Sequence, residues 1–296
     1  MIDKKNNRNL YAILLIILLV TIICAVILIL KNYGNNQHHV RSNTEEAIPT
    51  FYLHGYKGSA DSGNFLVNSA IKSGASKEVL QAYVSSDGKV TFDGNLTSKS
   101  QYPIIKIKLE DNNNENIEKN AKWIRNAIVA TNYQYNFEKF NFVAHSMSNK
   151  SFSYYMLNYG DDEQLPKLNK EVNLAGNFNG EVDVNGKKLN IKLDKNGKPN
   201  KMMDDYKELR AMKHHYPENK VKVLNIYGDV QDGTNSDGRV TNVSSHSLKY
   251  LLEDSVASYE TFKVYGPNAA HGKLANNKKV QDKINEFLWN KELNTK

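Results

Sequence analysis

The chain is poor in cysteine. Its 296 residues include a single one, Cys24, which lies inside a long apolar run near the N-terminus. The part of the chain after that run therefore forms no disulfide within itself, although an oxidising compartment would permit one. About 250 residues remain there, and a domain of that size buries enough apolar surface to fold without disulfides.

Clusters of Lys and Arg interleaved with aromatic residues, which are typical of proteins that bind nucleic acids, are also missing. The net charge is +7, of which residues 1–31 account for +3 and the remainder for +4. A mildly basic domain of this kind suits a position near anionic lipid or an anionic wall polymer. We therefore expect no nucleic acid among the partners. No internal repeat is visible.

The longest run without a charge extends from Leu10 to Leu30. About 20 apolar residues, with a rise of 1.5 Å each, cross a hydrocarbon core of about 30 Å, so this run predicts a transmembrane helix. A cleavable signal peptide has a shorter apolar region that ends in small residues, and no such site precedes Asn32. A lipidated Cys24 would need a small residue before it, where Ile23 stands. We predict an uncleaved single-pass anchor.

The charges beside this run predict its orientation. Residues 1–9 hold three basic side chains, and only Lys31 follows the run directly. The positive-inside rule then keeps the N-terminus in the cytoplasm and places the chain after the run outside the cell. The polar residues 31–47 are expected to form a flexible stalk. Two adjacent histidines in a linker, His38 and His39, do not easily converge on one ion, so no metal site is expected there.

Residues 48–296 alternate between strand-like and helix-like segments. Strands are predicted near 49–53, 78–84, 89–92, 102–109, 140–145, 172–175, 221–228 and 258–265. Helices are predicted near 64–74 (apolar face Phe65, Leu66, Ala70 and Ile71), 116–131, 150–159, 201–215, 245–254 and 277–289. This alternation predicts one α/β domain, a mainly parallel sheet with helices on both faces. The glycine-containing segment 178–200 is expected to be an insertion that forms a lid.

Residues 140–149 have the pattern of a nucleophile elbow. A strand-like apolar run turns sharply at Ser146 and continues into the helix-like segment 150–159. This arrangement exposes a serine hydroxyl at the carboxyl end of a central strand. The residues two before and two after the serine must be small, because the strand and the helix nearly touch there. Ala144 and Ser148 occupy these positions, where the usual pattern has glycine.

The first strand-like segment of the domain ends in the loop His54-Gly55-Tyr56-Lys57-Gly58-Ser59. Glycines such as Gly55 and Gly58 remove the Cβ that would keep the backbone away from a reacting carbonyl group. The loop therefore has the composition that an oxyanion hole requires.

A serine nucleophile needs a base, and the base follows the serine along the chain in proteins with this elbow. His271 follows the strand-like segment 258–265 through a short loop, so it lies at the same sheet edge as Ser146. His246, near the start of a helix-like segment, is the alternative base. His214 and His215 lie near the end of another helix-like segment and are expected to be structural.

The acid is expected in the loop after segment 221–228. Asp237 begins Asp237-Gly238-Arg239-Val240, in which the valine can pack back into the sheet. Asp229 follows the strand almost directly and is the alternative acid. The loop also resembles a cation-binding loop, but it lacks the Glu twelve residues along that completes an EF-hand. We expect no metal and no cofactor, and a cation in this loop is the alternative.

With these residues assembled, the chain resembles the α/β-hydrolases, and more narrowly their bacterial cell-surface branch. The resemblance covers roughly residues 48–290 and rests on 54–59, the hairpin around 86–90, 144–148, 236–240 and His271. It implies an α/β-hydrolase fold and the hydrolysis of small-molecule or lipid-like carboxylic esters. Ser146 would be the nucleophile, His271 the base and Asp237 the acid, with the N–H groups of Tyr56 and Met147 as the oxyanion hole.

A second interpretation is an inactive hydrolase fold that binds components of the cell envelope. The enzyme is favoured because the nucleophile, base, acid and oxyanion loop all persist in the expected order along the chain.

Overall fold

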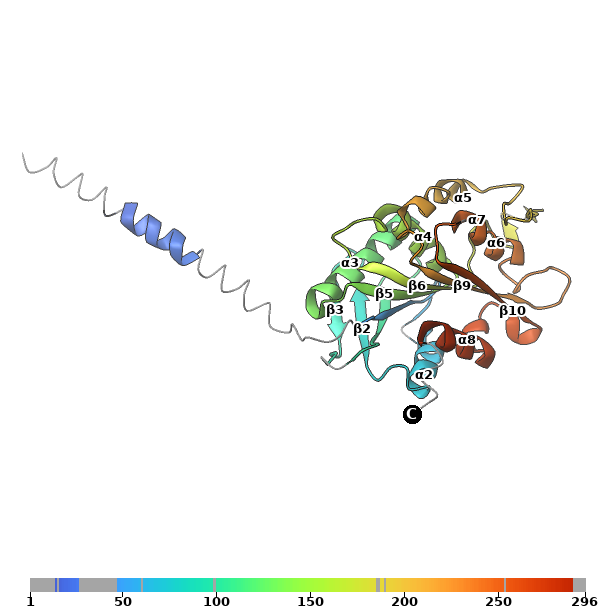
Figure 1. Cartoon of the computed structure of the whole chain (residues 1–296), viewed down its shortest axis with the longest axis horizontal. Coiled ribbons are helices and arrows are strands. Elements are labelled where there is room, and N and C mark those ends of the chain that lie inside the picture. The colour runs from blue at the N-terminus through green and yellow to red at the C-terminus, as the bar shows by residue number, and fades with distance from the viewer. Residues whose placement is uncertain are drawn as a thin grey trace, which may run out of the picture. The chain divides into compact units, whose positions relative to one another are not determined.

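The computed structural model describes residues 14, 16–26, 47–59, 61–97, 100–184, 187–188, 190–252 and 254–289 (Figure 1). The chain divides into two compact units, residues 1–42 and residues 43–296. In the first unit, residues 16–26 are helical, and the large apolar side chains described there are 46% to 63% exposed. The predicted transmembrane run 10–30 extends beyond these residues. Among the described residues, no helix is both long enough and apolar enough to cross a membrane. All of the predicted stalk except Ala47 lies outside the described residues.

The second unit is built on one sheet of eight strands in the order β10-β9-β6-β5-β1-β4-β2-β3. Every neighbouring pair is parallel except the hairpin of β2 and β3, so the predicted mainly parallel sheet is confirmed. The strands are β1 (Thr50–Leu53), β2 (Val79–Val84), β3 (Val90–Asp93), β4 (Ile104–Leu109), β5 (Lys139–His145), β6 (Lys167–Leu174), β9 (Lys222–Asp229) and β10 (Ser258–Tyr265).

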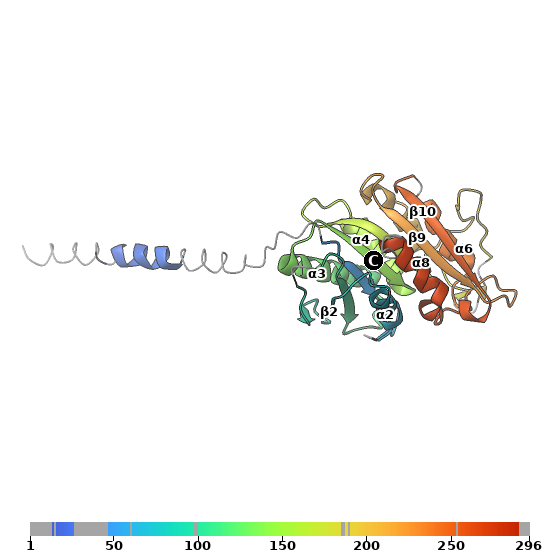
Figure 2. The same ribbon diagram turned by 60° about the horizontal axis from the view of Figure 1, so that its bottom comes forward.

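Helices cover both faces of this sheet, as predicted. In Figure 1, α3, α4 and α7 lie on one face, and α2 and α8 lie on the other. Figure 2 shows α2 beside α8, and these two helices contact each other. The helices are α2 (Asn64–Lys72), α3 (Ile117–Tyr135), α4 (Met147–Tyr159), α5 (Asp204–Leu209), α6 (Asn242–His246), α7 (Leu248–Leu252) and α8 (Lys278–Trp289), with short 3-10 helices η1 (Met212–His215), η2 (Pro267–Ala269) and η3 (Leu274–Asn276).

The central strands are buried on both faces, which is why they are apolar almost throughout. In β5, Phe140, Phe142 and Ala144 belong to the core on the side of α3 and α4. Val143 of the same strand belongs to the second core, with residues of α2 and α8. Because successive side chains of a strand point to opposite faces, a strand covered on both sides needs apolar residues at consecutive positions.

The predicted apolar face of the first helix is partly wrong. Leu66 and Ala70 of α2 are buried as expected, and Val67 is buried with them. Phe65 and Ile71 are instead 51% and 41% exposed. The three buried residues fall within a stripe of about 100° around the helix axis, and the two exposed ones lie outside it. A short helix that packs against α8 and the sheet buries only this stripe.

Two predicted helices are interrupted. The segment 201–215 contains α5, which ends at Leu209, and then the separate turn η1. The helix predicted at 245–254 begins earlier, at Asn242, because the Thr241 side chain accepts a hydrogen bond from the Ser244 N–H and caps the first turn. A second short helix, α7, then follows.

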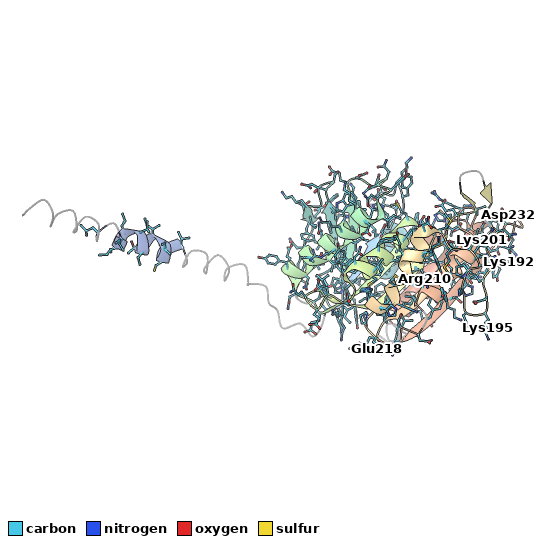
Figure 3. All side chains as sticks on the ribbon, turned by 90° about the horizontal axis from the view of Figure 1, so that it is seen from above. Lys192, Lys195, Lys201, Arg210, Glu218 and Asp232 are labelled. Atoms are coloured by element: carbon cyan, nitrogen blue, oxygen red, sulfur yellow. The ribbon has the colours of Figure 1, made fainter. Side chains whose placement is uncertain are left out.

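Segment 178–200, predicted to be an insertion, contains a short two-stranded hairpin of β7 (Asp183–Val184) and β8 (Lys187–Lys188). In the view of Figure 3, Lys192 of this segment, Lys201 just after it and Asp232 of the loop after β9 lie toward the same end of the domain. The Val182 N–H also donates to the Arg239 carbonyl at 2.8 Å. The segment therefore lies against the loop that carries Asp237, and its role as a lid remains a prediction.

Candidate active site

Ser146 stands at a sharp turn between β5 and α4. Its backbone has φ 57° and ψ −125°, a conformation that side-chain-bearing residues rarely adopt and that costs about 1–3 kcal/mol. Two hydrogen bonds from this turn to β6 hold it: the Ser146 N–H donates to the Leu174 carbonyl at 2.9 Å, and the Asn149 side-chain amide donates to the same carbonyl at 2.9 Å. The neighbouring strand thus fixes the backbone of the serine.

The two small residues that flank the turn are both buried. Ser148 departs from the usual glycine, and its hydroxyl is used fully. It accepts a hydrogen bond from the His145 N–H at 2.8 Å, and it faces two acceptors, the Leu53 carbonyl at 3.0 Å and the His145 carbonyl at 2.8 Å. The extra hydroxyl therefore connects the end of β5 to the end of β1.

The loop after β1 packs directly against this elbow. A Cβ added to Gly55 would lie 3.0 Å from the Ser146 Cβ and 3.1 Å from the His145 carbonyl oxygen. A Cβ added to Gly58 would lie within 2.7 Å of the His54 ring. Both contacts are closer than an ordinary side chain tolerates, which explains the two glycines of the loop in terms of space.

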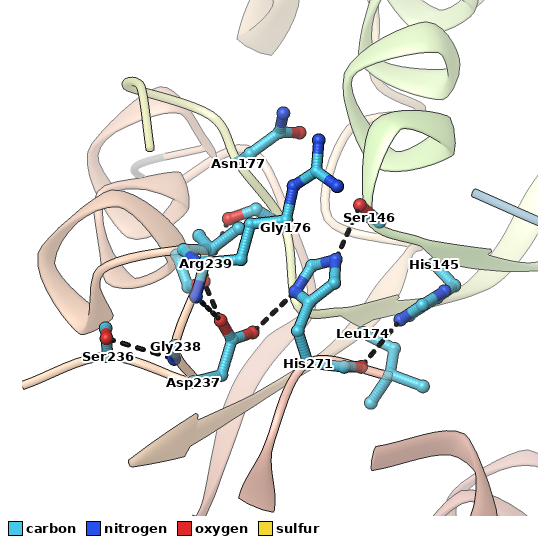
Figure 4. Close-up of polar contacts among 12 residues, drawn as sticks. His145, Ser146, Leu174, Gly176, Asn177, Ser236, Asp237, Gly238, Arg239 and His271 are labelled. Atoms are coloured by element: carbon cyan, nitrogen blue, oxygen red, sulfur yellow. Dashed lines mark hydrogen bonds and ion pairs between the residues drawn. The ribbon is translucent and has the colours of Figure 1, made fainter. Parts of the chain in front are cut away.

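Ser146, His271 and Asp237 form one hydrogen-bonded chain (Figure 4). The distance from Ser146 Oγ to His271 Nε2 is 2.8 Å, and the distance from His271 Nδ1 to Asp237 Oδ2 is also 2.8 Å. The other carboxylate oxygen, Asp237 Oδ1, accepts the N–H groups of Arg239 at 2.9 Å and Val240 at 2.7 Å. The structure thus brings together the three residues that the sequence predicts as nucleophile, base and acid.

The hydrogen bonds of this chain fix the tautomer of His271. A carboxylate oxygen can only accept, so Nδ1 donates to Asp237 and Nε2 keeps its lone pair. That lone pair faces the Ser146 hydroxyl, which makes Nε2 the proton acceptor. The Asp237 side chain is almost fully buried, and the His271 N–H also donates to the Asp237 carbonyl at 2.8 Å. Acid and base are therefore held by side chain and backbone together.

The alternative acid and base make other contacts. Asp229 Oδ2 lies 2.8 Å from Lys263 Nζ and 2.9 Å from Asn242 Nδ2. The hydrogen bond from Lys263 is the main reason that the pKa of Asp229 lies below its usual range. His246 is half-buried and stacks on Tyr227, with ring centres 6.0 Å apart. Neither residue joins the chain that ends at Ser146.

Two backbone N–H groups flank the serine where an oxyanion hole is expected. Met147 is the first residue of α4, and Tyr56 lies in the loop after β1. Within the described part of the chain, neither N–H donates a hydrogen bond to another residue. The loop itself is fixed by the Lys57 N–H, which donates to the Asn112 carbonyl at 2.8 Å, and by Asn112 Nδ2, which donates to the Gly58 carbonyl at 2.8 Å.

His145 lies beside the site, and the sequence predicts no role for it. Its ring centre lies 5.2 Å from that of His271, and its Nε2 lies 3.3 Å from the His271 carbonyl oxygen. Burial first, and then the nearby His271, lower the pKa of His145 to about 4. The ring is therefore neutral near pH 7 and adds no positive charge beside the base. Its place directly before Ser146 in the sequence was the signal that could have identified it.

His54 has a structural contact rather than a contact with Ser146. Its Nδ1 lies 2.8 Å from the Gly55 carbonyl oxygen, so Nδ1 carries the proton and donates. Burial lowers its pKa. Over the described ranges, no group of three or more His, Cys, Asp and Glu side chains is arranged to hold a metal ion.

These features define an α/β-hydrolase: a mainly parallel sheet, a serine on a strand–turn–helix elbow, and an acid and then a histidine further along the chain. The chain belongs to the family described as "Alpha/beta hydrolase of unknown function (DUF915)", whose model matches residues 37–291. The resemblance drawn from the sequence is therefore confirmed.

Two solved structures are similar to this chain over most of its length. The product of the lin2722 gene of Listeria innocua is 26% identical, with a TM-score of 0.72, over 82% of this chain and 94% of that chain. The "putative cell surface hydrolase" from Lactobacillus plantarum WCFS1 is 23% identical, with a TM-score of 0.67, over 83% of this chain and 92% of that chain. No curated protein matches the sequence significantly.

Proposed function

We propose that this α/β-hydrolase cleaves carboxylic esters by covalent catalysis at Ser146. The observation that carries the proposal is the unbroken chain from Ser146 Oγ through the His271 ring to Asp237, with both contacts at 2.8 Å. Esters of small-molecule or lipid-like acids and alcohols are the proposed substrates, and no cofactor takes part.

In the first half of the reaction, Ser146 Oγ attacks the ester carbonyl carbon while its proton passes to His271 Nε2. The negative charge that develops on the carbonyl oxygen is stabilised by the free N–H groups of Met147 and Tyr56. Asp237 stabilises the imidazolium and holds its orientation. The tetrahedral intermediate then collapses, and His271 gives the proton to the departing alkoxide, which leaves as the alcohol.

In the second half, water attacks the acyl-serine and His271 Nε2 takes the water proton. Collapse of the second tetrahedral intermediate returns that proton to Ser146 Oγ and releases the carboxylic acid. The strained backbone at Ser146 supports this sequence, because it holds the hydroxyl at the end of β5 within hydrogen-bonding distance of His271.

We also propose that residues 10–30 anchor the protein in the cell membrane, with the N-terminus in the cytoplasm and the hydrolase domain outside. The apolar run and its basic flank support this topology. The Lactobacillus plantarum protein that shares the fold carries a cell-surface name, which is consistent with it.

A panel of chromogenic esters tests the enzyme directly. The full-length protein is expected to release p-nitrophenol from short-chain esters and to react with a fluorophosphonate probe, whereas Ser146→Ala should do neither. A folded protein that neither hydrolyses any ester of the panel nor takes up the probe would be the inactive envelope-binding module instead.

A further inference from the structure

Arg239 occupies a position that the proposed chemistry does not use. It follows the acid by two residues, and its N–H donates to Asp237 Oδ1 at 2.9 Å. Its carbonyl oxygen accepts the Val182 N–H at 2.8 Å. The backbone of Arg239 is thus held between segment 178–200 and the same carboxylate that orients His271. In Figure 4, its side chain runs past the His271 ring, and the guanidinium group lies on the Ser146 side.

The guanidinium group is only partly engaged. Its Nε lies 3.2 Å from Glu181 Oε2, and the Arg239 side chain is 50% exposed. In the part of the chain that the structure describes, this is the only hydrogen bond or ion pair of the side chain. The N–H groups on the two terminal nitrogens therefore keep their capacity to donate, and one partner on Nε fixes where they point.

The surroundings of Arg239 favour a polar, anionic ligand. Asn177 donates to the second oxygen of Glu181 at 3.3 Å and so helps to hold the carboxylate that accepts from Arg239 Nε. The other two loops at this edge carry exposed cations, Lys57 beside Tyr56 and Lys273 two residues after His271. A substrate that enters here meets the unpaired N–H groups of the Arg239 guanidinium and the positive charge of the two lysines.

We infer that Arg239 binds an anionic group of the substrate, so that the enzyme prefers esters with a carboxylate or phosphate close to the scissile bond. A planar guanidinium matches the oxygens of either group with two parallel hydrogen bonds. The inference rests on the proposed ester hydrolysis. Glu181 serves as the residue that positions the guanidinium.

The test compares two p-nitrophenyl esters of equal length, the neutral valerate and the anionic glutarate monoester, on the full-length protein at low ionic strength. The p-nitrophenyl ester of 4-phosphonobutyrate distinguishes a phosphate-like group from a carboxylate. We expect the parent to prefer the anionic esters in kcat/KM, and Arg239→Gln to reduce that preference at least tenfold. Salt should weaken the preference of the parent, because exposed charges are screened.

Two variants separate substrate binding from a structural role. Glu181→Gln removes the negative charge but keeps a side-chain oxygen that can accept from Arg239 Nε, so the guanidinium keeps its position and the anionic preference should survive. Arg125→Gln is the matched control, because it removes a positive charge far from the site. Arg125 stacks on Tyr159, which lies twelve residues along α4 from Met147 and therefore about 18 Å from the elbow. This variant should leave the anionic preference unchanged. An equal loss of preference in Arg239→Gln and Glu181→Gln, or no loss in Arg239→Gln, overturns the inference.

A failure of the proposed function is distinguishable from a failure of the inference. If the parent hydrolyses none of the three esters, ester hydrolysis is wrong, and the anion site is tested by thermal unfolding with glutarate and with inorganic phosphate. A rise in Tm in the parent that is absent in Arg239→Gln supports the site. The absence of a rise in the parent refutes it.

Discussion

The hydroxyl of Ser148 is predicted to stabilise the elbow rather than to strain it. The side chain is 1% exposed, and its oxygen accepts from the His145 N–H while it faces the Leu53 and His145 carbonyl oxygens. Ser148→Ala removes the hydrogen bond that the hydroxyl accepts and the one that it donates, at about 0.5–1.5 kcal/mol each, so it should cost about 1–3 kcal/mol. Ser148→Gly adds a backbone entropy term of about 0.5–1 kcal/mol, so it should lose about 1.5–4 kcal/mol in all.

Turnover should change little in either variant. The position of Ser146 also depends on hydrogen bonds to the Leu174 carbonyl, from its own N–H and from the Asn149 side chain, and both substitutions leave these intact. We expect hydrolysis of a chromogenic ester within about threefold of the parent, because the Met147 N–H keeps its direction. Urea unfolding of the full-length protein, with the m-value compared between variants, measures the stability.

Ser151→Ala is the matched control. Ser151 lies in the same helix and is equally buried, but its hydroxyl makes only a long bond of 3.3 Å to the Met147 carbonyl, so its loss should cost under about 1 kcal/mol. If Ser148→Ala loses no more stability than this control, the bonds to the strand ends contribute nothing. A tenfold gain in turnover in Ser148→Gly would show that the serine holds the elbow in a poor geometry.

Further outcomes follow from the site. Ser146→Ala and His271→Ala should each reduce turnover by several powers of ten, and the two losses should not add in the double variant. Asp237→Asn should reduce turnover less than either, but far more than Asp229→Asn. A large loss of turnover in Asp229→Asn would refute the choice of acid. Since the folded-state pKa of His145 is about 4, below the ordinary value, unfolding stability should fall as the pH drops from about 6.5 towards 4, and His145→Gln should flatten that fall in urea titrations at several pH values. Protease added to intact cells should digest the hydrolase domain, and protection until the membrane is permeabilised would refute the orientation.

Much of the fold was predictable because parallel strands carry a strong local signal. Strands such as β5 and β9 are buried on both faces, so they read as short apolar runs, and β10 was predicted with its observed bounds. The order of the serine, acid and histidine along the chain placed all three at one sheet edge, and the structure brings them together. These features depend on residue type and on position along the chain.

Contacts between distant loops were not predictable in this way. No pattern in the sequence indicates that Glu181 pairs with Arg239, because the two residues are 58 positions apart and belong to different loops. The Leu53 carbonyl can accept from the Ser148 hydroxyl only because β1 lies beside β5. Phe65 is exposed because a different stripe of α2 packs against α8. In a helix of nine residues, the spacing of the apolar residues does not determine which stripe is buried.

The place of β1 in the sheet has a consequence for the order of folding during synthesis. It is the first strand of the domain to leave the ribosome, yet it lies in the middle of the sheet, where Thr50 pairs with Ile104 on one side and Asn141 on the other. One of the two hydrogen-bonding edges of β1 therefore has no partner until β5 has emerged. The nascent chain carries an unpaired apolar strand through that interval, which is the condition under which nascent chains need a chaperone. A chain that stops before residue 139 should aggregate, whereas one that includes β5 and its helix can close the centre of the sheet.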